Sequence, residues 1–140
     1  MNKKMLSLEE TKNLIASGLE LQIAGDESLL SQLPKGNWIG GTTPYFMCDD
    51  GGEVNLDKLY VEKVSHAVKH IKICSYSVSE IDNLAMAGFD NGYSYILIPA
   101  FSDVHKYYAN NAMKIPGIFN RPVIGWITGV HLDELGKITP

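Results

Sequence analysis

Apolar and polar residues alternate along this chain with two periods, one typical of helices and one typical of strands. Near the start, apolar residues recur at helical spacing as far as Leu14 and Ile15. Ser7 and Glu10 before them form an S-x-x-E capping box, in which each side chain bonds the backbone N–H of the other. Gly18 suits the left-handed conformation that ends many helices, because it has no Cβ. The pattern therefore predicts a first helix between Ser7 and Gly18.

Strands are predicted where apolar and polar side chains alternate at every second residue, as they do around Ile23 and Val61. The predicted strands cover residues 19–23, 37–41, 45–48, 58–64, 68–76, 93–100 and 123–130. Further helices are expected where a capping residue such as Asp26 or Ser79 precedes a helical pattern. These helices cover residues 26–33, 79–87 and 102–112. Helix and strand thus alternate along most of the chain.

This alternation indicates the fold class. We expect an α/β or α+β fold, built as one layered domain over residues 1–140 with a mixed sheet, a central hairpin and flanking helices. Residues 49–52 (DDGG) form a strong turn signal near the expected hairpin. No Pro-rich or Ser-rich linker divides the chain. Its abrupt end at residues 138–140 leaves open that the domain is truncated there.

Composition and charge limit the partners and the compartment that are expected for this protein. Hydrophobic residues make up 45% of the chain and charged residues 20%, as in ordinary globular proteins. The net charge is −4 and Arg121 is the one arginine, so a nucleic-acid partner is not expected. No apolar run approaches the roughly 18 residues of a membrane span, and Glu9 and Glu10 exclude a secretory signal. Cys48 and Cys74 lack metal-ligand spacing and fit reduced thiols, which predicts a cytoplasmic protein.

The first candidate binding site is the loop of Gly40, Gly41, Thr42 and Thr43, which follows a predicted strand. Ligands of open α/β sheets bind near the carboxyl ends of strands. Glycines let the backbone approach a ligand closely, and successive N–H groups with two threonine hydroxyls can hold an anion. The chain has neither a P-loop nor a G-x-G-x-x-G sequence. The alternative interpretation is a strand bend followed by a turn at Pro44.

The second candidate site combines the start of a predicted helix with the single arginine. Ser102, Asp103 and His105 follow an apolar strand, at a helix N-terminus that favours anions. Arg121 precedes the last strand, and its planar guanidinium suits a carboxylate or phosphate group. The alternative interpretations are a helix cap, a surface histidine and a surface salt bridge.

Residues 33–44 (LPKGNWIGGTTP) resemble the signature of the FIST sensory domain, in which a strand ends in a Gly-Cys or Gly-Ser-Thr loop. Residues 51–53 and 59–61 follow in the order of that family's hairpin and next strand, and residues 121–126 resemble a later strand. The chain departs from the family at Gly41, where Cys or Ser is common, and it is shorter than the two-part module. The resemblance implies a bacterial or archaeal signal-transduction domain that binds small molecules such as amino acids.

These observations favour a noncatalytic small-molecule-binding or sensory domain, with no cofactor and no metal. We expect its pocket to be formed by the loops at residues 40–44, 101–105 and 120–122. Backbone N–H groups and threonine hydroxyls would hold an anionic ligand there, and the guanidinium of Arg121 would balance its charge.

Two alternatives follow from the same residues. One is a hydrolase or acyl-transfer enzyme that uses Ser102 or Cys48 as the nucleophile and His105 as the base. The other is a structural or assembly module. The sequence leaves open a homo-oligomer, whereas neither nucleic acid nor a membrane is an expected partner.

Overall fold

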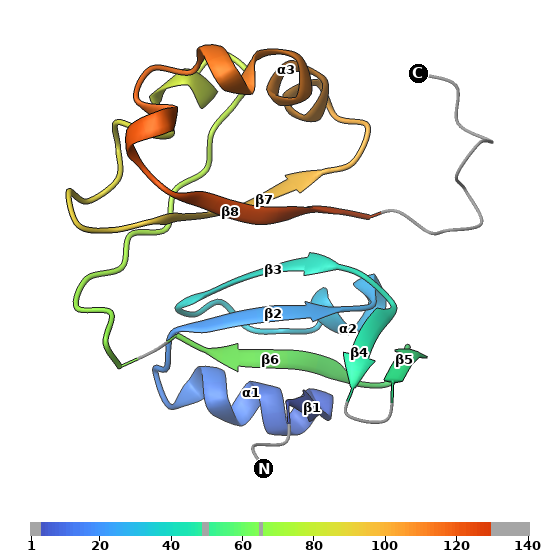
Figure 1. Cartoon of the computed structure of the whole chain (residues 1–140). Coiled ribbons are helices and arrows are strands. Elements are labelled where there is room, and N and C mark those ends of the chain that lie inside the picture. The colour runs from blue at the N-terminus through green and yellow to red at the C-terminus, as the bar shows by residue number, and fades with distance from the viewer. Residues whose placement is uncertain (1–3, 49–50, 65, 130–140) are drawn as a thin grey trace. The chain divides into compact units, whose positions relative to one another are not determined.

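The computed structural model describes residues 4–48, 51–64 and 66–129. These residues fall into two compact units, one made of residues 4–73 with Gly129 and the other of residues 74–128 (Figure 1). That the whole chain forms one domain stays a prediction. The first two residues of the predicted turn, 49–50, lie outside the described residues, and so does the expected truncation at residues 138–140.

The first unit is built on a mixed four-stranded sheet in the order β1-β6-β2-β3. Its strands are β1 (Met5–Leu6), β2 (Leu21–Gly25), β3 (Trp38–Thr42) and β6 (Leu59–Lys63). β2 and β3 run parallel, whereas β6 is antiparallel to both β1 and β2. The expected mixed sheet is therefore confirmed. β1 was not predicted, because two residues are too short to give a periodic signal.

Helix α1 (Leu8–Ala16) begins and ends where the sequence predicts. The hydroxyl of Ser7 accepts the N–H of Glu10 at 3.2 Å, and the Glu10 carboxylate accepts the N–H of Ser7 at 2.7 Å. This is the expected capping box, and it satisfies two N–H groups that the helix itself cannot bond. Gly18 has a φ of 78°, the left-handed conformation predicted for it.

The next helix, α2 (Glu27–Leu30), is shorter than the predicted range of residues 26–33. Its N-cap is Asp26, as expected, and the carboxylate of Asp26 accepts the N–H of Ser28 at 2.9 Å. It connects the parallel strands β2 and β3, which need a crossover rather than a tight turn between them.

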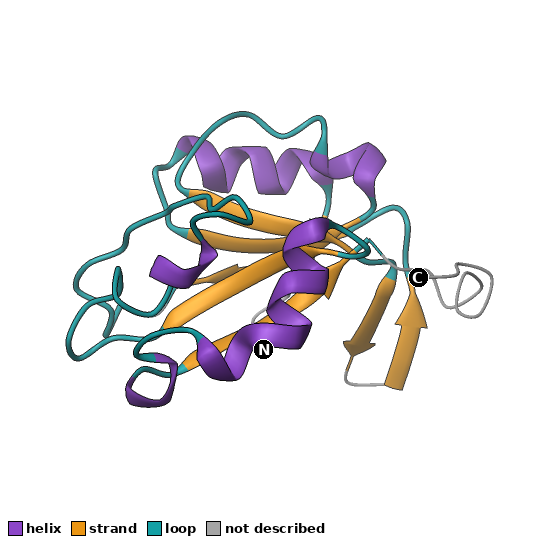
Figure 2. Cartoon of the chain, turned by 90° about the horizontal axis from the view of Figure 1, so that it is seen from above, coloured by secondary structure: helices purple, strands orange, loops and turns teal. Residues whose placement is uncertain are grey.

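The expected central hairpin consists of β4 (Tyr45–Cys48) and β5 (Gly51–Val54), which pair antiparallel. β5 was not predicted as a strand, and the assignment of Gly51 and Gly52 to the turn was wrong, because both glycines pair with β4. Figure 1 and Figure 2 both show it as a pair of strands that stands apart from the four-stranded sheet. Phe46 of β4 is buried and stacks on Tyr60 of β6, with ring centroids 6.4 Å apart and an interplanar angle of 15°. Such offset aromatic pairs add to the stabilisation from buried area. This contact attaches the hairpin to the sheet.

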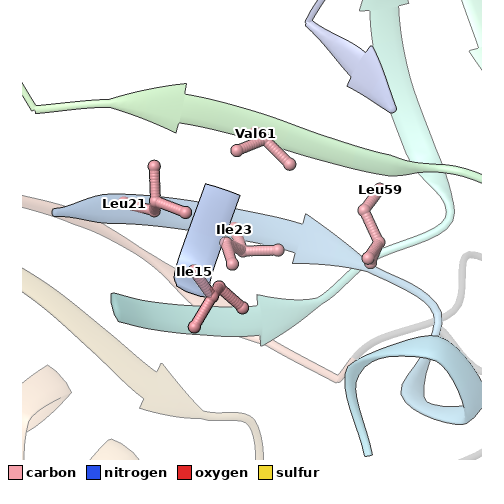
Figure 3. Close-up of a cluster of buried hydrophobic side chains, with 5 residues drawn as sticks. All are labelled: Ile15, Leu21, Ile23, Leu59 and Val61. Atoms are coloured by element: carbon pink, nitrogen blue, oxygen red, sulfur yellow. The ribbon is translucent and has the colours of Figure 1, made fainter. Parts of the chain in front are cut away.

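The core of the first unit lies between α1 and the sheet. Five buried side chains meet there from α1, β2 and β6 (Figure 3): Ile15, Leu21, Ile23, Leu59 and Val61. The three side chains of β2 and β6 that are most deeply buried expose 2% of their surface or less. Removing apolar surface of this kind from water is the main favourable term in folding.

The second unit contains a two-stranded parallel sheet of β7 (Ser94–Pro99) and β8 (Val123–Thr128). Helix α3 (Asp103–Asn111) connects them and lies against β7. Three short 3₁₀ helices complete its regular structure: η1 (Ile81–Asn83), η2 (Ala112–Lys114) and η3 (Ile118–Asn120). The predicted strands at 93–100 and 123–130 and the helix at 102–112 are thus present, each slightly shorter.

Two predicted elements differ in the structure. Residues 68–76 show the alternation of a strand but belong to no sheet in the described part of the chain. Alternation describes a half-buried surface, and a strand also needs a partner for its backbone groups. The predicted helix at 79–87 is reduced to turns around η1. There the carboxylate of Glu80 turns back to accept the N–H of Ser77 at 3.0 Å and its hydroxyl proton at 2.6 Å.

A charged cluster fastens the start of the first unit to β6. The ammonium of Lys4 donates to the carboxylate of Glu62 at 2.5 Å and to the hydroxyl of Tyr60 at 3.1 Å. That hydroxyl donates in turn to the same Glu62 oxygen at 2.7 Å. The hydrogen bonds from Lys4 and Tyr60 lower the pKa of Glu62. The pKa of Lys4 is raised, chiefly by its bond to Glu62. The cluster stabilises the charged form of both groups.

Leu59 tests the core of the first unit, because its side chain is fully buried. We expect Leu59→Ala to lower the free energy of unfolding by about 2–5 kcal/mol, from lost burial and the cavity left behind. Leu56→Ala is the matched control, since Leu56 is 51% exposed and its change should stay within about 0.5 kcal/mol. Denaturant unfolding measures both values. Equal losses in the two variants would contradict this assignment of the core.

Glu62→Gln tests the charged cluster through pH. Because the folded-state pKa of Glu62 lies below its ordinary value of 4.5, its stabilising effect is present above that pH and is lost as pH falls through the folded pKa. We expect Glu62→Gln to lower the urea midpoint at pH 7 and the difference from the unsubstituted chain to shrink below pH 4.5. Glu20→Gln, at an exposed position, is the control. A difference that stays constant from pH 7 to pH 3 would refute this effect of the cluster.

Candidate functional site

The predicted glycine-threonine loop lies largely within β3. Gly40, Gly41 and Thr42 are strand residues, and Thr43 follows directly. In the register of the parallel pair, Gly25 at the end of β2 lies opposite Thr42 at the end of β3. The carboxyl ends of two parallel strands therefore meet here, which is the edge of a sheet where ligands commonly bind.

Position 40 requires a glycine for a structural reason that the sequence did not reveal. A Cβ at this position would lie 2.6 Å from the carbonyl oxygen of Ile23 in β2 and 3.1 Å from the ring of Trp38. The backbone oxygen cannot move away as a flexible side chain could. A residue without Cβ is therefore required for β3 to pair with β2 at this point.

Hydrogen bonds show which way the backbone amides of β3 point. The N–H of Thr43 donates to the carbonyl of Gly25 at 3.0 Å, toward β2. The N–H and C=O of one residue point to the same side of a strand, and successive residues alternate between the two sides. The N–H and C=O groups of Gly40 and Thr42 are therefore directed away from β2. On that side the Thr42 carbonyl accepts the N–H of Gly129 at 3.1 Å. The amides of Gly40 and Thr42 are thus the donors that the β3 edge can present.

Thr43 forms a local turn with its side chain. Its hydroxyl oxygen accepts the N–H of Tyr45 at 3.2 Å. Threonine hydroxyls often bond the backbone two residues ahead in this way. The bond closes the bend around Pro44, which is the alternative that the sequence suggested for this loop.

Ser102 and His105 are brought together at the start of α3, where Ser102 is the N-cap. The Ser102 hydroxyl accepts the N–H of His105 at 3.1 Å and donates its proton to the carbonyl of Pro99 at 2.7 Å. Nδ1 of His105 accepts the N–H of Phe101 at 3.1 Å. Asp103 occupies the first turn, where a negative charge is favourable. All of these bonds serve the helix start.

The backbone of Phe101, just before α3, has an unfavourable conformation that the bonds at this helix start hold in place. Its φ is 60°, in the left-handed region that bulky residues rarely adopt. The imidazole of His105 bonds its N–H and also contacts its ring edge-on, with centroids 6.4 Å apart. The histidine therefore holds an unfavourable backbone conformation in place.

Arg121 binds the chain itself in this structure. One guanidinium nitrogen donates to the carbonyls of Gly88 at 3.0 Å and Phe89 at 2.6 Å, and the other donates to the carboxylate of Asp90 at 3.0 Å. The fork of donors closes the loop before β7 from a position just before β8. This is the inter-element salt bridge that the sequence offered as an alternative to a ligand contact.

The predicted site residues divide between the two units. Gly40, Gly41, Thr42 and Thr43 belong to the first unit, and the others belong to the second: Ser102, Asp103, His105 and Arg121. A pocket that joins all of them stays a prediction. Sequence reasoning missed the cluster of Lys4, Tyr60 and Glu62. Tyr60 and Glu62 share a face of a strand and were detectable as a pair, but Lys4 lies more than fifty residues away in sequence.

The described residues hold no group of three or more His, Cys, Asp or Glu side chains that could bind a metal. None of the helices in this part of the chain is long and apolar enough to span a membrane. Neither cysteine forms a disulfide in the described part of the chain; Cys48 is half-buried and Cys74 is exposed.

Comparison with known proteins places the chain in a family. Residues 6–140 match the model of DUF6976, a family of unknown function, and the chain belongs to that family. No curated protein and no solved structure matches it. The family description states no activity, so the resemblance to FIST domains stays a prediction.

Ser102 tests whether the start of α3 is a cap. We expect Ser102→Ala to destabilise the helix by about 1 kcal/mol, because one helix N–H loses its acceptor. Ser102→Asp should retain most of the stability, since an aspartate caps equally well and its charge is favourable at this helix end. Hydrogen exchange of the α3 amides measures both. Equal loss of protection in the two variants would argue against the capping role.

Proposed function

We propose that this chain is a cytoplasmic, noncatalytic domain that binds a small molecule with an anionic group, as a sensory domain does. The observation that carries the proposal is the parallel pair of β2 and β3, whose carboxyl ends meet at Gly25 and Thr42. This is the place in a sheet at which loops and backbone amides commonly form ligand sites.

The donors at this edge favour an anion. The amides of Gly40 and Thr42 are directed to the same side of β3, away from β2, and the hydroxyl of Thr42 lies at the end of the strand. Backbone N–H groups carry partial positive charge, so they suit a carboxylate or phosphate oxygen. The amide of Thr43 does not contribute, since it bonds the carbonyl of Gly25.

A binding role is favoured over an enzyme with Ser102 as its nucleophile by the bonds at the start of α3. Hydrolysis through Ser102 requires its hydroxyl proton to pass to a ring nitrogen of His105. Here that proton is directed to the carbonyl of Pro99, and Nδ1 of the histidine accepts a backbone N–H. Both side chains already have a structural role that needs no substrate.

A thermal-shift screen against carboxylate and phosphate metabolites tests the proposal. A ligand that binds only the folded chain adds about 2.7 kcal/mol of stability at a hundredfold excess over its Kd, so the melting temperature should rise with ligand concentration. Thr42→Val removes one hydroxyl at nearly constant shape and should reduce the shift at a given concentration. Glu20→Gln, at an exposed position just before the start of β2, is the control and should keep the full shift.

Two results would count against the proposal. One is a screen in which no anionic metabolite gives a concentration-dependent shift. The other is a shift of the same size in the Thr42→Val variant, which would move the binding site away from the end of β3.

A further inference from the structure

A basic stretch of this acidic chain follows β6. Residues 63–76 contain three lysines and two histidines and no aspartate or glutamate. The whole chain carries a net charge of −4, so its remaining residues carry −7 when histidine is counted as neutral. Such a charge asymmetry within a short segment often marks an interaction surface.

Residues 68–76 of this segment are also largely exposed and lie outside the sheets of the described residues. Figure 1 draws residues 68–76 as a coloured tube with neither a helix nor an arrow. Each residue from 69 to 75 is exposed. Ile71 is 41% exposed and Ile73 is 51% exposed, although isoleucine is among the residues most often buried. These two exposed isoleucines are spaced two apart, with Lys69 and Lys72 beside them.

The residue types of the segment favour a strand. β-branched residues such as Ile71 and Ile73 fit a pleated surface, and the stretch has no glycine or proline to interrupt pairing. In an extended conformation Lys69, Ile71 and Ile73 share one face and Lys72 lies on the other. The segment therefore has the pattern of a strand without a neighbouring strand in the described part of the chain.

We propose that residues 68–75 pair, as an added strand, with an acidic extended segment of another protein. Pairing of this kind takes its affinity from main-chain hydrogen bonds and its specificity from alternate side chains. Acidic residues opposite Lys69 and Lys72 would form favourable cross-strand pairs, and apolar residues would cover the two isoleucines. This interaction is independent of the ligand site proposed at β3.

Charge argues against a second copy of the chain as the partner. Two such segments side by side would bring four lysines together, and like charges directly opposite each other destabilise a strand pair. An acidic partner segment removes that repulsion.

Disulfide trapping at Cys74 tests the proposal, because this exposed thiol directly follows Ile73. The full chain is equilibrated in a glutathione buffer with ten-residue peptides that each carry one terminal cysteine. The Glu-Val peptide has Glu at the positions opposite Lys69 and Lys72 and Val at the positions opposite Ile71 and Ile73. The second peptide replaces each Glu by Gln, and the Glu-Gly-Pro peptide replaces the two Val residues by Gly and Pro. Mass spectrometry measures the fraction of chain trapped with each peptide, and Cys74→Ser corrects for reaction at Cys48.

We expect the Glu-Val peptide to be trapped at least threefold more than either of the other two. Lys69→Glu with Lys72→Glu should abolish that preference. Ile71→Pro removes a backbone N–H from an exposed coil and should reduce it, with Ser75→Pro, nearer the end of the segment, as the milder control.

Several outcomes would overturn the proposal. Equal trapping of the Glu-Val and Glu-Gly-Pro peptides would show simple attraction between charges without strand pairing. Disulfide dimers of the chain in excess of peptide adducts would favour a second copy. A lysine-dependent association with phosphatidylserine vesicles, measured by sedimentation, together with no preference among the peptides, would favour a lipid surface.

Discussion

Burial of the apolar face shared by β2 and β6 is the interaction on which the first unit depends. Leu21 and Ile23 of β2 and Leu59 of β6 lie almost completely out of water, and Ile15 of α1 packs among them. Because side chains alternate between the faces of a strand, a slip of one residue would expose this whole set. The core therefore fixes the register of β2, and the parallel pairing of β3 places Thr42 beside Gly25.

Glycine serves close strand pairing in both units. Gly40 allows β3 to approach the carbonyl of Ile23, and a Cβ at Gly125 in β8 would overlap the carbonyl oxygen of Ile96 in β7. In each case the glycine lies in the second strand of a parallel pair. A glycine-rich sequence can suggest a ligand-binding loop. In this chain these two glycines are needed for the paired strands to approach each other. Any ligand at β3 must use the donors that remain on its outer side.

The polar candidates show a similar division of roles. Ser102 caps a helix, His105 supports a strained phenylalanine, and Arg121 closes a loop through three donor bonds. Each of these side chains bonds nearby backbone, where it replaces water that folding removes. The same chemistry that would recognise a ligand also satisfies the protein's own carbonyl and N–H groups. Residue type alone cannot separate these two uses.

Local signals in the sequence determined the elements whose causes are local. The capping box at Ser7, the left-handed Gly18 and the cap at Asp26 all form as predicted, because each depends on residues within one turn of helix. The class of fold follows from the same signals, since two periods of hydrophobicity alternate along the chain.

The tertiary structure alone decided the rest. Residues 68–76 have the pattern of a strand but no neighbour in the described sheets, because pairing depends on segments far away in sequence. The contact of Lys4 with Glu62, the bonds of Arg121 to residues 88–90 and the crowding at Gly40 arise in the same way. A periodic pattern records which face of a segment is to be buried. Which segment covers that face is settled only when the whole chain packs.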